Sequence, residues 1–159
     1  MVTESAAVII REIEAAFAQV EHPGDQSLLH SQCMDDHDID IEDFYGDIHW
    51  RDVPDDIIER NNASLRFFSP EAFRFYLPAF LTWVLRNFAA TDSFTVDSTI
   101  YSLDPGDDDL GDFAKSKYSL LDHRQRTAVA NLLNYLKANG QGMVDEDAVK
   151  KALLLWQEQ

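Results

Sequence analysis

Three side chains of metal-binding type stand at helical spacing in the middle of the chain: His30, Cys33 and His37. Imidazole nitrogen and thiolate sulfur are common zinc ligands, and residues three and four positions apart share one face of a helix. Asp36 or His49 would supply a fourth ligand. Structural zinc sites usually contain paired cysteines, however, whereas this chain has a single cysteine. We therefore predict no metal site and interpret Cys33 as half-buried beside surface histidines.

Carboxylates are concentrated in two segments. The stretch from Asp35 to Glu59 contains eleven acidic residues and one basic residue, and the stretch from Asp104 to Asp112 contains five acidic residues and no basic residue. We interpret both stretches as acidic surface that can bind a basic partner. The residues predicted to contact that partner are Asp35, Asp36, Asp38, Asp40, Asp43, Asp107, Asp108 and Asp109.

Sequence motifs of catalytic and cofactor-binding sites are absent. The chain has no Gly-x-Ser-x-Gly elbow, no glycine-rich phosphate loop, no His-Glu-x-x-His and no paired Cys-x-x-Cys. Asp36, Asp38 and Asp40 alternate as in a calcium-binding loop, but Ile41 stands where such a loop requires glycine. We therefore expect no cofactor and favour a binding protein over an enzyme.

The charge and the apolar runs exclude several classes of protein. The formal net charge is -16, which disfavours direct binding to the phosphate backbone of nucleic acids. Charged residues interrupt the first part of the chain, and the longest strongly apolar stretch, Phe75–Leu85, is shorter than the roughly 20 residues that cross a bilayer. With no internal disulfide possible, we expect a cytoplasmic protein that does not enter a membrane.

Apolar residues recur every three or four positions in several long segments, which predicts helices. The expected long helices cover about residues 6–20, 69–88, 119–139 and 145–156, and shorter ones residues 39–45 and the segment that starts at Pro54. Residues 94–103 suit a strand by residue type and a helix by spacing, and we choose helix. A length of 159 residues fits one domain. The prediction is therefore a single all-α domain over residues 1–159.

The segment 69–88 is expected at the centre of this helical bundle. Ser69 and Pro70 form a strong helix start, and the residues that follow are apolar nearly all round the helix. Pro78 lacks an amide hydrogen, so we expect a kink or a break there. Aromatic residues crowd this part of the chain, and core packing explains them better than an apolar partner groove. They are Phe67, Phe68, Phe73, Phe75, Tyr76, Phe80 and Trp83.

The stretch FSPEAFRFYLPAFL, Phe68 to Leu81, resembles the signature of a family of small, acidic, uncharacterised bacterial proteins, a domain of unknown function. In that family such a helix start leads into a Tyr-Leu-Pro-Ala core, here residues 76–79. Trp50 and the entry at 17–24 are further similarities, as is the 125–136 helix, so the resemblance spans most of the chain. It implies no activity, no cofactor and no catalytic residue.

The sequence thus favours a non-catalytic protein-interaction module that presents an acidic surface to a basic partner. The alternative is a metal-dependent enzyme that uses the His- and Asp-rich segment 30–49. High negative charge can also serve solubility alone.

Overall fold

The structure, a computed structural model, describes residues 3–29, 41–104 and 111–157, with side chains described from residue 115 onward in the last range. These residues form α-helices and short 3-10 helices. The α-helices are α1 Glu4–Phe17, α2 Asp55–Arg60, α3 Pro70–Asn87, α4 Thr95–Tyr101, α5 Gly111–Tyr118, α6 His123–Asn139 and α7 Glu146–Gln157. Short 3-10 helices are η1 Asp25–Ser27, η3 Ile41–Phe44, η4 Trp50–Asp52 and η5 Ser64–Arg66. This part of the chain has no strand, only an isolated bridge between Leu29 and Phe68. The all-α prediction is confirmed.

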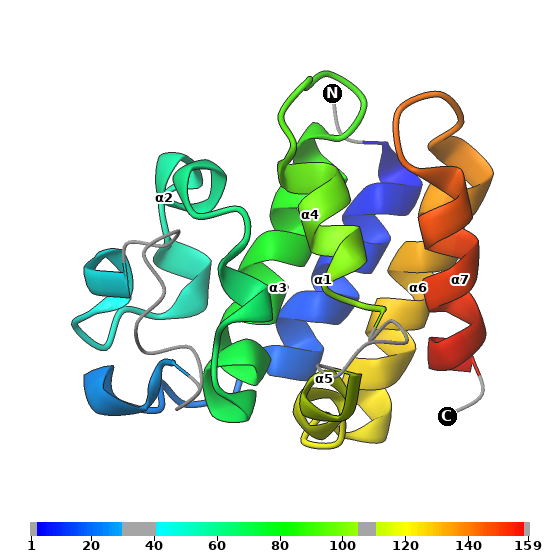
Figure 1. Cartoon of the computed structure of the whole chain (residues 1–159). Helices are drawn as coiled ribbons and strands as arrows, with labels where there is room; N and C mark the ends of the chain where they lie inside the picture. Colours follow the sequence, from blue (N-terminus) through cyan, green and yellow to red (C-terminus); the bar gives the residue numbers. More distant parts are fainter. Residues whose placement is uncertain (1–2, 30–40, 105–110, 158–159) are drawn as a thin grey trace.

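The helices are arranged around α3. Figure 1 shows α1, α6 and α7 on one side of α3, and α2 with the short 3-10 helices on the other. α1 runs toward the end of the bundle at which α3 and α6 begin, while the turns after α3 and α6 lie at the opposite end. None of the described helices is long and apolar enough to cross a membrane.

Helix α3 is the centre of the core. Ser69 caps it by accepting a hydrogen bond from the amide of Ala72 at 3.1 Å, and Pro70 occupies its first turn. Every side chain from Ala72 to Leu85 is buried except that of Arg74, which is partly buried. The predicted aromatic core is confirmed for all its members except Phe67, which is partly buried.

Pro78 does not break α3, which is continuous from Pro70 to Asn87. The proline removes the amide that would bond the carbonyl of Arg74. One turn later the Thr82 hydroxyl lies 2.9 Å from the carbonyl oxygen of Pro78, to which it donates. The elements that bury the side chains around Pro78 hold α3 together by packing despite the missing bond.

The other helix predictions hold with local corrections. Residues 94–103 contain helix α4. Helix α6 begins at His123 rather than near residue 119, because residues 119–121 form the turn before it and its capping box is formed by Asp122 and Gln125. In the expected helix 39–45, the described part forms η3. Helix α5 has no counterpart in the sequence analysis.

Asp145 joins α4 to α7. Its Oδ1 accepts from the amide of Ala148 at 3.1 Å and its Oδ2 from the Tyr101 hydroxyl at 2.8 Å, while its own amide donates to Asp97 at 3.0 Å. The Ala148 amide and then the Tyr101 hydroxyl hold the pKa of the Asp145 carboxyl below its ordinary value. The ionised carboxylate therefore stabilises the fold.

Replacing Leu77, which is 0% exposed, with alanine is expected to lower the free energy of unfolding by about 2–5 kcal/mol, because it leaves a cavity in the core. Leu154→Ala is the control, since Leu154 is 66% exposed and should cost less than about 0.5 kcal/mol. Urea titration measures both values. Equal losses would place α3 outside the core.

Asp145→Ala is expected to cost about 1 kcal/mol at neutral pH, the usual loss for a removed helix cap. A carboxyl with a lowered folded-state pKa contributes stability above its ordinary pKa of 3.8 and loses it as the pH falls through the folded-state value. The gap between wild type and Asp145→Ala should therefore shrink in urea titrations at pH 3. Asp92→Ala, at an exposed turn, should show no such gap; a pH-independent loss at Asp145 would contradict the linkage.

Candidate functional site

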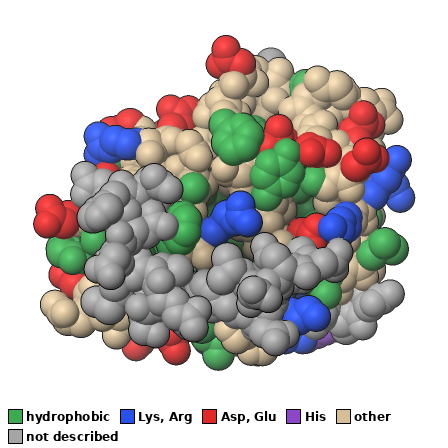
Figure 2. Space-filling model, viewed as in Figure 1, with side chains coloured by type: hydrophobic (Ala, Val, Ile, Leu, Met, Phe, Trp, Pro, Cys, Tyr) green, Lys and Arg blue, Asp and Glu red, His purple; other side chains and the backbone are tan. Residues whose placement is uncertain are grey.

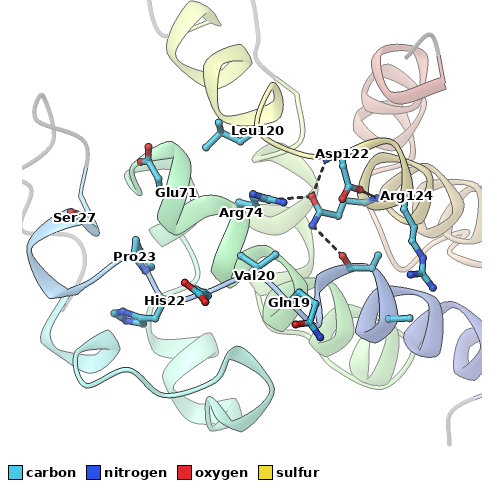
Figure 3. Close-up of a pocket in the computed structure, with 14 residues that line it drawn as sticks. Gln19, Val20, His22, Pro23, Ser27, Glu71, Arg74, Leu120, Asp122 and Arg124 are labelled. Atoms are coloured by element: carbon cyan, nitrogen blue, oxygen red, sulfur yellow. Dashed lines mark hydrogen bonds between the residues drawn. The ribbon is translucent and has the colours of Figure 1, made fainter.

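Buried Gln125 ties together three helices at one end of the bundle. Its side chain is 1% exposed, and its Oε1 accepts from the Asp122 amide at 2.9 Å and from Arg74 Nε at 3.2 Å. Its Nε2 donates to the carbonyl of Ala16 at 3.1 Å (Figure 3). Since these partners belong to α6, α3 and α1, one amide group fixes the end of α1 against the starts of the other two helices.

An open hollow of about 840 Å³ lies beside this amide (Figure 3). Its charged lining residues are Glu21, Glu71, Asp122, Arg74 and Arg124. Val20, Pro23 and Leu120 add apolar surface, and Leu120 is 38% exposed. The hollow therefore combines apolar contact area with charges of both signs.

A second hollow of about 550 Å³ shares residues 19–22 with the first. It is lined by Asp47, His49 and Phe75, together with the shared Glu21 and His22. The ring centroids of His22 and His49 lie 5.3 and 6.3 Å from that of Phe75, both in edge-to-face geometry. We call the two hollows together the end groove.

Both histidines of the end groove are bound to the backbone. Nδ1 of His22 accepts from the Gly24 amide at 3.0 Å, and Nδ1 of His49 accepts from the Arg51 amide at 3.0 Å. The neutral rings therefore carry their proton on Nε2, and Nε2 of His22 lies 3.2 Å from the carbonyl oxygen of Phe44. These bonds hold the rings in place at the wall of the groove.

Tyr76 donates to the same carbonyl oxygen of Phe44 at 2.8 Å. Burial raises the pKa of its phenol, and the negative charges of Asp25 and Asp47 raise it further. The hydroxyl therefore stays protonated at neutral pH and acts as a structural donor rather than a base.

Among the described residues, three exposed carboxylates of the end groove form no ion pair with Lys or Arg. All lysine and arginine residues of the chain lie in the described ranges. Between described residues, the ion pairs are Arg60–Asp43, Arg86–Asp55 and Lys151–Asp104. None of them involves Glu21, Asp47 or Glu71, which are exposed. Figure 2 shows that acidic side chains on the face it draws are scattered, with basic ones among them.

Among the sequence-predicted contact residues, Asp43 lies in the described part. Its Oδ2 accepts from Asn61 Nδ2 at 2.9 Å and pairs with Arg60 at 3.0 Å, and its side chain is 16% exposed. The structure thus gives Asp43 an intramolecular role, and contact with a partner stays a prediction. Outside the described residues lie Asp35, Asp36, Asp38, Asp40, Asp107, Asp108 and Asp109.

His30, Cys33 and His37, which were considered as metal ligands and not predicted to be a site, also lie outside the described residues. Within the described ranges, no group of three or more His, Cys, Asp or Glu side chains is placed to hold a metal ion. The sequence analysis missed the end groove. Its one visible signal was the polar Gln125 on an otherwise apolar helix face.

A family model described as a family of unknown function (DUF6714) matches residues 5–159. No curated protein and no solved structure matches the chain. The match includes α1, α3 and α6, the three helices that meet at Gln125.

Gln125→Leu is expected to lower the free energy of unfolding by about 0.5–1.5 kcal/mol for each hydrogen bond lost, here the partly buried bonds to the Ala16 carbonyl and the Asp122 amide. Gln157→Leu, at the exposed end of α7, is the control and should change little. Urea titration gives both values. A loss no greater than that of the control would show that Gln125 does not tie the helices together.

Proposed function

The chain belongs to the family of unknown function DUF6714, and on that premise we propose that it is a non-catalytic protein-interaction module that binds a segment of a basic protein in the end groove. The observation that carries this proposal is the set of exposed carboxylates there without a Lys or Arg partner among the described residues: Glu21, Asp47 and Glu71. Cationic side chains of a partner would neutralise them.

The shape of the groove supports a polypeptide ligand. Its two hollows are open to solvent and follow one another along residues 19–22, so an extended segment can lie across both. Val20, Pro23 and Leu120 offer apolar contacts beside the charges. Apolar contact contributes affinity, whereas charge complementarity mainly raises the association rate and rejects wrong partners.

The acidic segment 35–43 extends the same proposal. The negative charge of this segment would attract a basic protein over longer range than the groove alone, and it would lose this effect at high salt. Asp43 contributes least to such a surface, because it is paired with Arg60.

A metal-dependent enzyme built on residues 30–49 is the less favoured function. Its described part brings Asp47 and His49 into the second hollow beside His22 and Glu21. Both imidazole rings there already accept a backbone amide at Nδ1, so their positions are explained without a reaction.

The charge-neutral triple variant Glu21→Gln, Asp47→Asn, Glu71→Gln is expected to bind a fluorescent peptide of alternating lysine and alanine about tenfold more weakly than wild type at low salt, since three exposed attractions are lost. Fluorescence anisotropy measures the affinity. The difference should vanish in molar salt, where the Debye length is about 3 Å.

The matched control is Asp92→Asn, Glu146→Gln, Asp147→Asn, which removes the same charge from exposed positions outside the groove. It should retain most of the wild-type affinity. Equal losses of affinity in the two triple variants would mean that the peptide responds only to the net charge of the protein, and that the groove is not a binding site. A separate variant with Asp35, Asp36, Asp38 and Asp40 changed to asparagine tests the acidic segment. If this segment attracts the partner, the association rate of the variant should fall.

A further inference from the structure

Arg74 is a positively charged residue near the start of α3, a helix whose side chains are otherwise mostly apolar. It is the one partly buried side chain among the buried residues of α3 between Ala72 and Leu85, and it lines the larger hollow of the end groove. Its side chain bonds Gln125, and Figure 3 shows its guanidinium extending from α3 toward Asp122 at the start of α6. Among the described residues, no carboxylate lies within ion-pair distance of it.

The hydrogen bonding of Arg74 leaves one edge of the guanidinium open. Its Nε donates to Gln125 Oε1 at 3.2 Å, which fixes the plane of the group. Its two terminal nitrogens have no hydrogen-bond acceptor among the described residues. Two parallel N–H groups on a planar, always charged fork match the two oxygens of a carboxylate.

The surrounding charges select the kind of anion. Glu21, Glu71 and Asp122 line the same hollow as Arg74, so a doubly charged phosphate would meet stronger repulsion than a singly charged carboxylate. The same three acids favour positive groups next to that carboxylate. The hollow is therefore suited to a ligand that carries a single carboxylate among cationic side chains.

We propose that Arg74 binds the C-terminal carboxylate of the basic partner segment, through its two terminal nitrogens. This inference rests on the proposed function and names the feature of the partner that the groove recognises. A basic segment has few acidic side chains, but every protein chain ends in a carboxylate, and capture of that group is a recurring mode of peptide recognition. The cationic side chains that precede the terminus then lie toward Glu21 and Asp47.

The test compares two versions of the labelled lysine–alanine peptide, one with a free C-terminal carboxylate and one with a C-terminal amide. Wild type is expected to bind the free acid about ten- to a hundredfold more tightly, the range for a hydrogen-bonded charge pair. Amidation makes the peptide more positive, which by simple charge attraction would strengthen its binding to this acidic protein. If amidation lowers the affinity, the change is therefore opposite to the one that net charge predicts.

Variants assign the effect to Arg74. Arg74→Met should bind both peptides equally, and Arg74→Lys should keep only part of the preference, because an ammonium is a point charge without the planar fork. Arg124→Met is the matched control in the same hollow and should keep the full preference.

Three results would overturn the inference while leaving the proposed function intact. The first is equal binding of both peptides to wild type, and the second is a full preference retained in Arg74→Met. The third is an amidated peptide with aspartate as its last residue that binds as tightly as the peptide with the free C-terminal carboxylate. The first of these comes from wild type alone and does not depend on the folding of a variant. Binding of neither peptide would overturn the proposed function, and this inference with it.

Discussion

Helix α3 is apolar around almost its whole circumference, and this constrains the position of the other described helices. Exposing such a surface to water costs free energy in proportion to its area, so other elements have to surround it. They come from both sides of α3 in the sequence, α1 before it and α4, α5 and α6 after it. The end groove lies where this cover is incomplete, and α3 contributes Glu71, Arg74 and Phe75 to its lining.

Much of this architecture could be predicted from sequence because helix periodicity and caps are local properties. The start of α3 was predicted from the capping residue Ser69 and from Pro70, and helix α7 from the spacing of its apolar residues. The break expected at Pro78 was wrong, because local reasoning does not include the packing of neighbouring helices around α3. Helix α5 was missed because its start lies in the acidic segment 104–112, which was interpreted as partner-binding surface without assigned secondary structure.

The candidate site was much less predictable than the fold. The acidic segments are visible in the sequence because their charges are contiguous, whereas the end groove depends on Ala16, Arg74 and Gln125, which are far apart in the chain. The sequence placed Gln125 on the apolar side of its helix but gave no indication of its partners. A site whose residues meet only in the folded state leaves little signal in the sequence, here the single polar residue Gln125 on an apolar helix face.

Helix α1 packs against α6, which is synthesised much later. Thr3, just before α1, lies with its hydroxyl oxygen 2.7 Å from that of Tyr135 in α6, and Asn131 of α6 donates to Glu12 of α1 at 3.0 Å. The ribosome releases α1 first, and contacts over so many intervening residues form slowly. The apolar side chains of α1, among them Ile13 and Phe17, therefore stay incompletely covered until α6 has emerged, and apolar surface exposed in this way promotes aggregation during folding.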